Sequence, residues 1–203
     1  MAAKGRPRDE AARERIVSAA TDLFLRHGYV ATTVSAVAEQ AQVAVKTIYA
    51  AYDNKLGMLR AAHDRAVLGY GTPLPLIKHP WVQSLSNAES APAAWDDAVD
   101  QLAESTARVA PILTVVHRAA ADSGVAALLD ELRRQRHTFS LELAQILTAL
   151  PGAGGGAVDR VADVIYATMT VESYALFVTE RRWTLEQWRE WARETVAREL
   201  TPT

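Results

Sequence analysis

The sequence predicts an all-α fold of about nine helices, with a small N-terminal three-helix domain and a larger C-terminal helical domain. Apolar residues recur at intervals of three and four along most of the 203 residues, as they do on one face of a helix. The alternating apolar and polar runs that are typical of strands are almost absent. We expect one domain over residues 1–55 and the other over residues 56–203.

The first 69 residues are expected to form four short helices. The first ends near Gly28, and five apolar residues at helical spacing mark its buried face: Ile16, Ala19, Ala20, Leu23 and Phe24. Thr33 is expected to cap the second helix, and residues 43–52 form the third. Asn54 is expected to cap the fourth.

Glycines and prolines between residues 69 and 92 predict a long connection. Trp81, Val82 and Leu85 are expected to anchor that connection to the rest of the domain. A helix then begins near Pro92, and it should end or kink at Pro111, because proline lacks the amide hydrogen that the helix needs. Ile112, Val115, Val116 and Ala119 are expected to continue on a new axis.

The apolar pattern predicts three further helices in the C-terminal part of the chain. The first follows a break at residues 122–124 and extends to about Leu150. After a glycine-rich connector, residues 157–180 are expected to form the second as one continuous helix. Thr184 and Gln187 have the spacing of a capping box, which predicts the start of the last helix.

Composition narrows the possible functions. The net charge is −2, with an excess of three positive charges in residues 1–60 and of five negative charges in the remainder. A basic N-terminal part suits a polyanionic partner. The chain has no cysteine, no apolar run of about 18 residues and no apolar signal core, so we expect a cytoplasmic protein. The five histidines have no metal-ligand spacing and no catalytic motif is present, so we expect neither an enzyme nor a cofactor.

Residues 34–52 have the features of a helix-turn-helix. Ala38 is small where the two helices would cross, while Val43 and Ile48 would point between them. This arrangement leaves one face of the third helix open to a DNA groove, and it carries Ala44, Val45, Lys46, Thr47 and Tyr49. Thr33 and Lys55 begin the neighbouring helices, where they are expected to contact DNA phosphates.

Two alternatives remain open at this point. Val45, Ile48, Tyr49 and Tyr52 are also spaced like a buried stripe, so the open face could instead be core. The basic residues before the first helix, Lys4, Arg6 and Arg8, could reach along DNA or could be an ordinary solvated segment.

The stretch TTVSAVAEQAQVAVKTIYAAYDNKLGML, residues 32–59, resembles the DNA-binding domain of TetR-family transcriptional regulators, and residues 19–34 match as well. The resemblance implies a homodimer that represses by binding a palindromic operator and is released by a small-molecule effector. The sequence departs from the family at Gln42, where glycine is usual, and at Ala44, where a capping serine is frequent. If Gln42 has a positive φ, its side chain strains the turn by about 1 kcal/mol.

The resemblance also implies an effector pocket and a dimer interface in the C-terminal domain. The candidate pocket residues, any of which could instead be plain core, suit a hydrophobic or aromatic effector: Trp95, Leu102, Ile112, Val116, His117, Phe139, Leu143, Tyr166, Met169 and Tyr174. The expected interface includes Val171, Leu176 and Trp188, because the helix over 157–180 is apolar on most sides. An interior helix of a monomer would have the same composition. The alternative function is a helical protein–protein adaptor with a vestigial helix-turn-helix.

Overall fold

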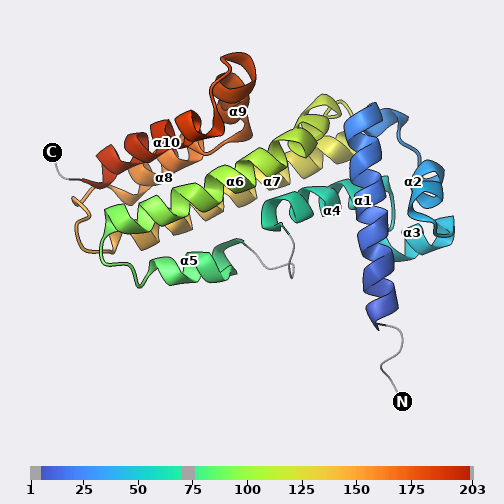
Figure 1. Cartoon of the computed structure of the whole chain (residues 1–203), viewed down its shortest axis with the longest axis horizontal. Helices are drawn as coiled ribbons and strands as arrows, with labels where there is room; N and C mark the ends of the chain where they lie inside the picture. Colours follow the sequence, from blue (N-terminus) through green and yellow to red (C-terminus); the bar gives the residue numbers. More distant parts are fainter. Residues whose placement is uncertain (1–5, 70–75, 202–203) are drawn as a thin grey trace. The chain divides into compact units, whose positions relative to one another are not determined.

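The computed structural model describes residues 6–69 and 76–201, with side chains from residue 9 onward. All the regular structure within these ranges is helical, as the sequence predicts (Figure 1). The chain divides into two compact units. The first unit comprises Met1–Ala66 and Pro111–Asp130, and the second comprises Val67–Ala110 and Glu131–Thr203. The predicted functional boundary after residue 55 stays a prediction.

The first unit contains the N-terminal helices α1 (Arg6–Ala31), α2 (Val34–Ala41), α3 (Val45–Tyr52) and most of α4 (Lys55–Leu68). The glycine break predicted for the first helix is confirmed, because Gly28 has φ 78° and ψ 171° inside α1. The core of this unit is built from fully or almost fully buried side chains on all four helices: Ile16, Ala20, Phe24, Val37, Ala38, Ile48, Met58 and Leu59. Their spacing follows the helical period on which the sequence prediction relied.

The turn between α2 and α3 depends on a left-handed residue. Gln42 has φ 55° and ψ 48°, and its amide donates to the carbonyl of Glu39. This confirms the positive φ that the family resemblance implied for this position. An L-residue with a side chain is strained in this conformation, whereas glycine adopts it readily.

Gln42→Gly should therefore raise the free energy of unfolding by up to about 1 kcal/mol, as measured by urea denaturation. Glu39→Gly is the matched control: it lies on the exposed face of α2, where glycine should cost about 1 kcal/mol. A Gln42→Gly variant that is as unstable as Glu39→Gly would show that the turn carries no such strain.

Within the described residues, the second unit contains the last two residues of α4 and eight further helices or parts of helices. They are η1 (Leu76–Lys78), α5 (Pro80–Leu85), parts of α6 (Ala91–Arg118) and α7 (Ser123–Thr148), α8 (Val158–Thr168), α9 (Val171–Tyr174), η2 (Ala175–Glu180) and α10 (Leu185–Leu200). Helices α8 and α10 lie side by side (Figure 1). The predicted capping box is confirmed, because the Thr184 side chain accepts from the Gln187 amide and the Gln187 side chain accepts from the Thr184 amide.

A single apolar core fills the second unit. Its largest fully buried side chains come from α6, α7, α8 and α10: Trp95, Leu143, Leu147, Ile165 and Trp188. Val82 and Leu85 of α5 are also buried in it, which confirms that they anchor the predicted connection.

Helix α6 does not end at Pro111 but continues to Arg118; the alternative expectation, a kink at Pro111, stays a prediction. Pro111 is exposed while its neighbours Ile112 and Leu113 are buried, and burial of the flanking turns outweighs one lost backbone hydrogen bond.

The helix expected over 157–180 is instead bent by 44° between α8 and the following segment. Thr170 has extended backbone angles and its hydroxyl accepts from the Ser173 amide, so it begins a new helix rather than continuing the old one. Within the described ranges, no single helix is long and apolar enough to cross a membrane, and only this bent pair reaches that length and composition together, as buried core helices also do.

Candidate nucleic-acid interface

Helix α3 has one buried side and one open side. Ile48 is completely buried, whereas Val45 and Tyr49 are 38% and 49% exposed. Ala44 and Lys46 are exposed as well, and Thr47 is half-buried. The stripe of apolar residues that could have been core is therefore divided: Ile48 packs inward, while Val45 and Tyr49 face away from the unit. The open face carries a cation, a hydroxyl and an aromatic ring, which are groups that can contact DNA bases and phosphates.

Tyr52 fixes the end of α3 against α1. Its hydroxyl donates to the carbonyl of Arg13 over 3.2 Å, and the Arg13 guanidinium lies 5.7 Å from the centre of its ring. Burial is the main reason that the pKa of Tyr52 is raised, so the phenol keeps the proton that it donates. Tyr52 therefore belongs to the packing that orients α3, and its hydroxyl has the partner that a half-buried tyrosine needs.

The N-termini of α2 and α3 are capped differently. The Thr33 hydroxyl accepts from the Ala36 amide over 3.1 Å and caps α2, as predicted. Ala44 is the N-cap residue of α3, and it supplies no side-chain hydrogen bond. The start of α3 is held instead by the Thr47 amide, which donates to the Ala44 carbonyl over 2.8 Å.

Helix α4 begins directly behind α3. Asn54 caps it as predicted, because its side-chain oxygen accepts from the Gly57 amide over 2.9 Å. Lys55 follows, and its ammonium does not extend into solvent as a phosphate contact would. It donates to the backbone carbonyls of Tyr29, Val30 and Thr32. A phosphate contact at Lys55 would have to replace one of these bonds.

The basic N-terminal residues cannot be placed at this interface. Lys4 lies outside the described residues, and the side chains of Arg6 and Arg8 are outside them too. The backbone of Arg6 and Arg8 belongs to α1, which begins at Arg6. Their contact with DNA stays a prediction.

The residues predicted to line an effector pocket lie mainly in the interior. Six of them are buried: Trp95, Leu102, Ile112, Val116, Leu143 and Met169. The other four, His117, Phe139, Tyr166 and Tyr174, are half-buried. Some have clear structural partners. The Trp95 indole donates to the Arg193 carbonyl over 3.0 Å, and the Arg136 guanidinium donates to the Tyr166 hydroxyl over 3.1 Å. Their role in effector binding stays a prediction.

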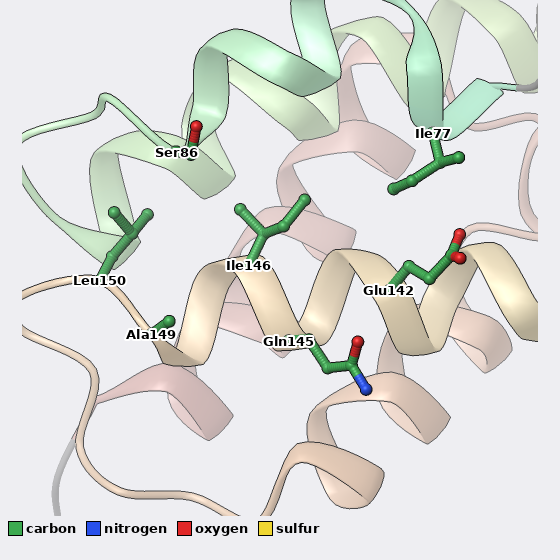
Figure 2. A pocket seen from close by; sticks show the side chains of 7 residues that line it. All are labelled: Ile77, Ser86, Glu142, Gln145, Ile146, Ala149 and Leu150. Carbon is green, nitrogen blue, oxygen red and sulfur yellow. The ribbon is translucent and has the colours of Figure 1, made fainter.

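A different set of residues forms an open groove on the second unit, shown in Figure 2. Its volume is about 500 Å³, within the range of small-molecule sites. The groove lies between η1, the end of α5 and the C-terminal half of α7. Its lining consists of Ile77, Ser86, Glu142, Gln145, Ile146, Ala149 and Leu150. The residues of this groove were not predicted from the sequence, because those on α7 are indistinguishable from an ordinary amphipathic surface.

Two of the three residues predicted for the dimer interface are buried within one chain, and the interface itself stays a prediction. Trp188 is completely buried within one chain, and Val171 is almost so. The Trp188 indole donates to the Ser173 hydroxyl over 3.1 Å, and its ring lies edge-on to Tyr174 at 5.4 Å. Both are core residues, since their apolar surface is already covered. Leu176, at 47% exposure, remains available to a partner.

No cluster of three or more His, Cys, Asp or Glu side chains that could hold a metal ion occurs among the described residues. The arrangement in the first unit defines a helix-turn-helix domain whose second helix has an exposed polar and aromatic face.

Comparison with known proteins identifies the kind of helix-turn-helix. Residues 16–62 match the family model of bacterial regulatory proteins, tetR family, which confirms the resemblance of this segment to that family. The chain is 46% identical over 56 residues to the uncharacterised HTH-type transcriptional regulator YdeS of Bacillus subtilis. The matched segment covers 28% of this chain and 28% of that relative.

Solved structures extend the similarity to nearly the whole chain. NalD, the secondary repressor of the MexAB-OprM multidrug efflux pump in Pseudomonas aeruginosa, has a TM-score of 0.67 and 17% identity, over 97% of this chain and 98% of its own. SmeT in complex with triclosan has a TM-score of 0.70 and 19% identity, over 94% of this chain and 92% of its own. At these identities the two structures show that the fold is shared.

Proposed function

We propose that this protein is a transcriptional regulator that binds a palindromic DNA operator as a homodimer and is released by a small molecule. The observation that carries the proposal is the open face of α3. It exposes Lys46 and Tyr49 and half-exposes Thr47, on a helix whose opposite side is fixed in the core by Ile48. A helix presented in this way fits the major groove of DNA, where its side chains reach base edges.

The two-fold symmetry of a palindromic operator requires two copies of α3, and hence a dimer. We place the dimer contact on the outer surface of the segment from α8 to α10. Leu176 is exposed there, and the half-buried rings of Phe177, Trp183 and Trp191 pack together beside it, with centroid distances of 4.6 Å from Phe177 to each tryptophan. Aromatic side chains are enriched at such interfaces.

The effector is proposed to be a small hydrophobic or aromatic molecule, and its binding to the second unit would lower operator affinity. The groove in Figure 2 offers apolar contacts from Ile77, Ile146 and Leu150, together with the polar groups of Glu142 and Gln145. A mainly apolar site with a few polar groups suits a ligand of this kind. SmeT, which shares the fold, has been solved with triclosan. A regulator of this type acts in the cytoplasm, where the operator is.

Selection of bound sequences from a random DNA library tests the function directly. The regulator should enrich a palindrome, and a shift assay at stated salt should show that this operator binds far more tightly than random DNA, typically by a factor of about 10³ or more. A folded protein that enriches no sequence would instead support a helical protein–protein adaptor with a vestigial helix-turn-helix.

A further inference from the structure

Lys55, the first residue of α4, has its ammonium group surrounded by backbone oxygens. The Nζ atom lies 2.8 Å from the Tyr29 carbonyl oxygen, 3.3 Å from that of Val30 and 3.0 Å from that of Thr32. It also lies 4.3 Å from the centre of the Tyr29 ring, within cation–π distance. A lysine ammonium has three hydrogens to donate, so these three carbonyls account for all of them.

Two of the three carbonyls, those of Tyr29 and Val30, belong to the end of α1, and that of Thr32 belongs to the link between α1 and α2. Gly28 interrupts the regular helix just before them, so the last carbonyls of α1 lack the amide partners of a continuing helix. They are also at the negative end of the helix dipole, where a cation is favourable. Lys55 supplies that cation from a residue 23 to 26 positions further along the chain. It therefore holds a turn that has little regular structure of its own.

The residue that follows this turn is Thr33, one of the predicted DNA contacts. Its backbone has extended angles, φ −106° and ψ 152°, and its hydroxyl oxygen accepts from Ala36. The hydroxyl hydrogen has no acceptor among the residues that the structure describes, and it could donate to a phosphate. The position of Thr33 depends on the preceding peptide, whose carbonyl, that of Thr32, is one of the three bound by Lys55.

We propose that Lys55 is a positioning residue for DNA binding, not the phosphate ligand that its place in the sequence suggested. It fixes the α1–α2 turn so that the Thr33 hydroxyl faces the DNA backbone. This inference rests on the proposed DNA-binding function. A positioning role for Lys55 differs from a phosphate contact in the salt dependence of operator affinity. Each neutralised phosphate contributes about 0.9 to the slope of log affinity against log salt, whereas a residue that acts through another leaves this slope unchanged.

The test compares Lys55→Met with Lys46→Met in the full-length protein. Both substitutions remove one lysine charge per chain, but Lys46 is exposed on α3 and makes no contact of this kind with the described residues. Lys55→Met should lower the melting temperature by about 3 °C or more, because three charge-assisted bonds are lost, and Lys46→Met should leave it unchanged. Operator affinity of Lys55→Met should fall about tenfold at every salt concentration, the size of effect expected from one lost charged hydrogen-bond group, with an unchanged salt slope.

A double-variant cycle tests the route through Thr33. If Lys55 acts by placing Thr33, adding Thr33→Ala to Lys55→Met should weaken operator binding by no more than about threefold beyond Lys55→Met alone, although Thr33→Ala alone weakens it more. Fully multiplicative effects would mean that the two residues act independently, and would contradict the proposal.

Lys55→Arg separates charge from geometry, and it also serves if Lys55→Met does not fold. Its planar guanidinium keeps the charge but cannot converge on three carbonyls as an ammonium does. If Lys55 is a positioning residue, Lys55→Arg should bind the operator less tightly than wild type, with the same slope of log affinity against log salt. Two results would identify Lys55 as a phosphate ligand and overturn the proposal. One is wild-type operator affinity in Lys55→Arg. The other is a salt slope lowered by about 1.8 per dimer in Lys55→Met together with an unchanged melting temperature.

The proposed function and this inference fail in different ways. If wild-type protein binds no operator, the function is wrong, and the melting temperatures still show whether Lys55 holds the turn. If wild type binds but Lys55→Met changes neither affinity nor melting temperature, the function stands and the positioning role is wrong.

Discussion

Replacing Trp188 with alanine should lower the free energy of unfolding by about 3–5 kcal/mol, the range for removing a large aromatic side chain from a core. Trp188 is fully buried and contacts Ser173 through its indole hydrogen and Tyr174 through its ring. The substitution therefore leaves a cavity and also removes the hydrogen bond to Ser173. Urea denaturation followed by circular dichroism measures the loss.

Leu176→Glu is the informative partner for this experiment, because Leu176 lies on the exposed side of the same region. We expect it to keep its helical signal and its unfolding midpoint at low protein concentration, while sedimentation shows monomers in place of dimers. A Trp188→Ala variant that is as stable as wild type but monomeric would mean that Trp188 lies at the interface after all.

Replacing Gly57 with alanine should destabilise the first unit by about 3 kcal/mol, at the upper end of the range for overpacking. A Cβ atom on Gly57 would lie 3.1 Å from the carbonyl carbon of Tyr52 and closer still to its oxygen. Because the obstacle is backbone, no side-chain rotation relieves it. The Tyr52 carbonyl also accepts from the Asn54 amide over 2.6 Å, so moving it disturbs the junction between α3 and α4. Operator affinity should fall with stability, since Tyr52 ends the helix that we propose as the DNA-binding helix.

Gly124→Ala is the control for this prediction. Gly124 is also a helical glycine of the first unit, but a Cβ there would meet only the ends of two side chains, Asp122 at 3.2 Å and Leu56 at 3.3 Å. The Leu56 end can shift, whereas the Asp122 carboxylate oxygen accepts from the Gly124 and Val125 amides and need give by only a few tenths of an ångström. We therefore expect a smaller loss of melting temperature than for Gly57→Ala. Equal losses in the two variants would show that the Tyr52 contact has no special cost.

Local signals in the sequence predicted the N-terminal domain well, because each depends on a few neighbouring residues. The caps at Thr33 and Asn54 are of this kind, whereas the left-handed turn at Gln42 was implied by the family resemblance. The exposed side of α3 was harder. Val45 and Tyr49 have the spacing of a core stripe, and only the packing of α3 against its neighbours shows that they face outward.

The predictions were weakest where residues distant in the sequence decide the outcome. Trp188 could be interior or interface by composition, since both environments are apolar, and its burial depends on residues of α9 that the sequence does not place. The break at Thr170 depends on hydroxyl bonds to the backbone that a smooth apolar pattern conceals. Lys55 was interpreted as a phosphate ligand because its three carbonyl partners lie more than 20 residues away.

The central claim is that the open face of α3 recognises a particular DNA sequence, and the affinity ratio between selected operator and random DNA tests it most directly. Thr47→Ala should lower operator affinity about tenfold and random-DNA affinity much less, because contacts to base edges contribute about 1–3 kcal/mol of discrimination. Thr138→Ala, at an exposed position of α7, should leave both affinities unchanged. If Thr47→Ala, shown to be a folded dimer, keeps the wild-type ratio, then α3 does not recognise sequence through this residue as we propose. A wild-type protein with no preference for any DNA sequence would contradict the account as a whole.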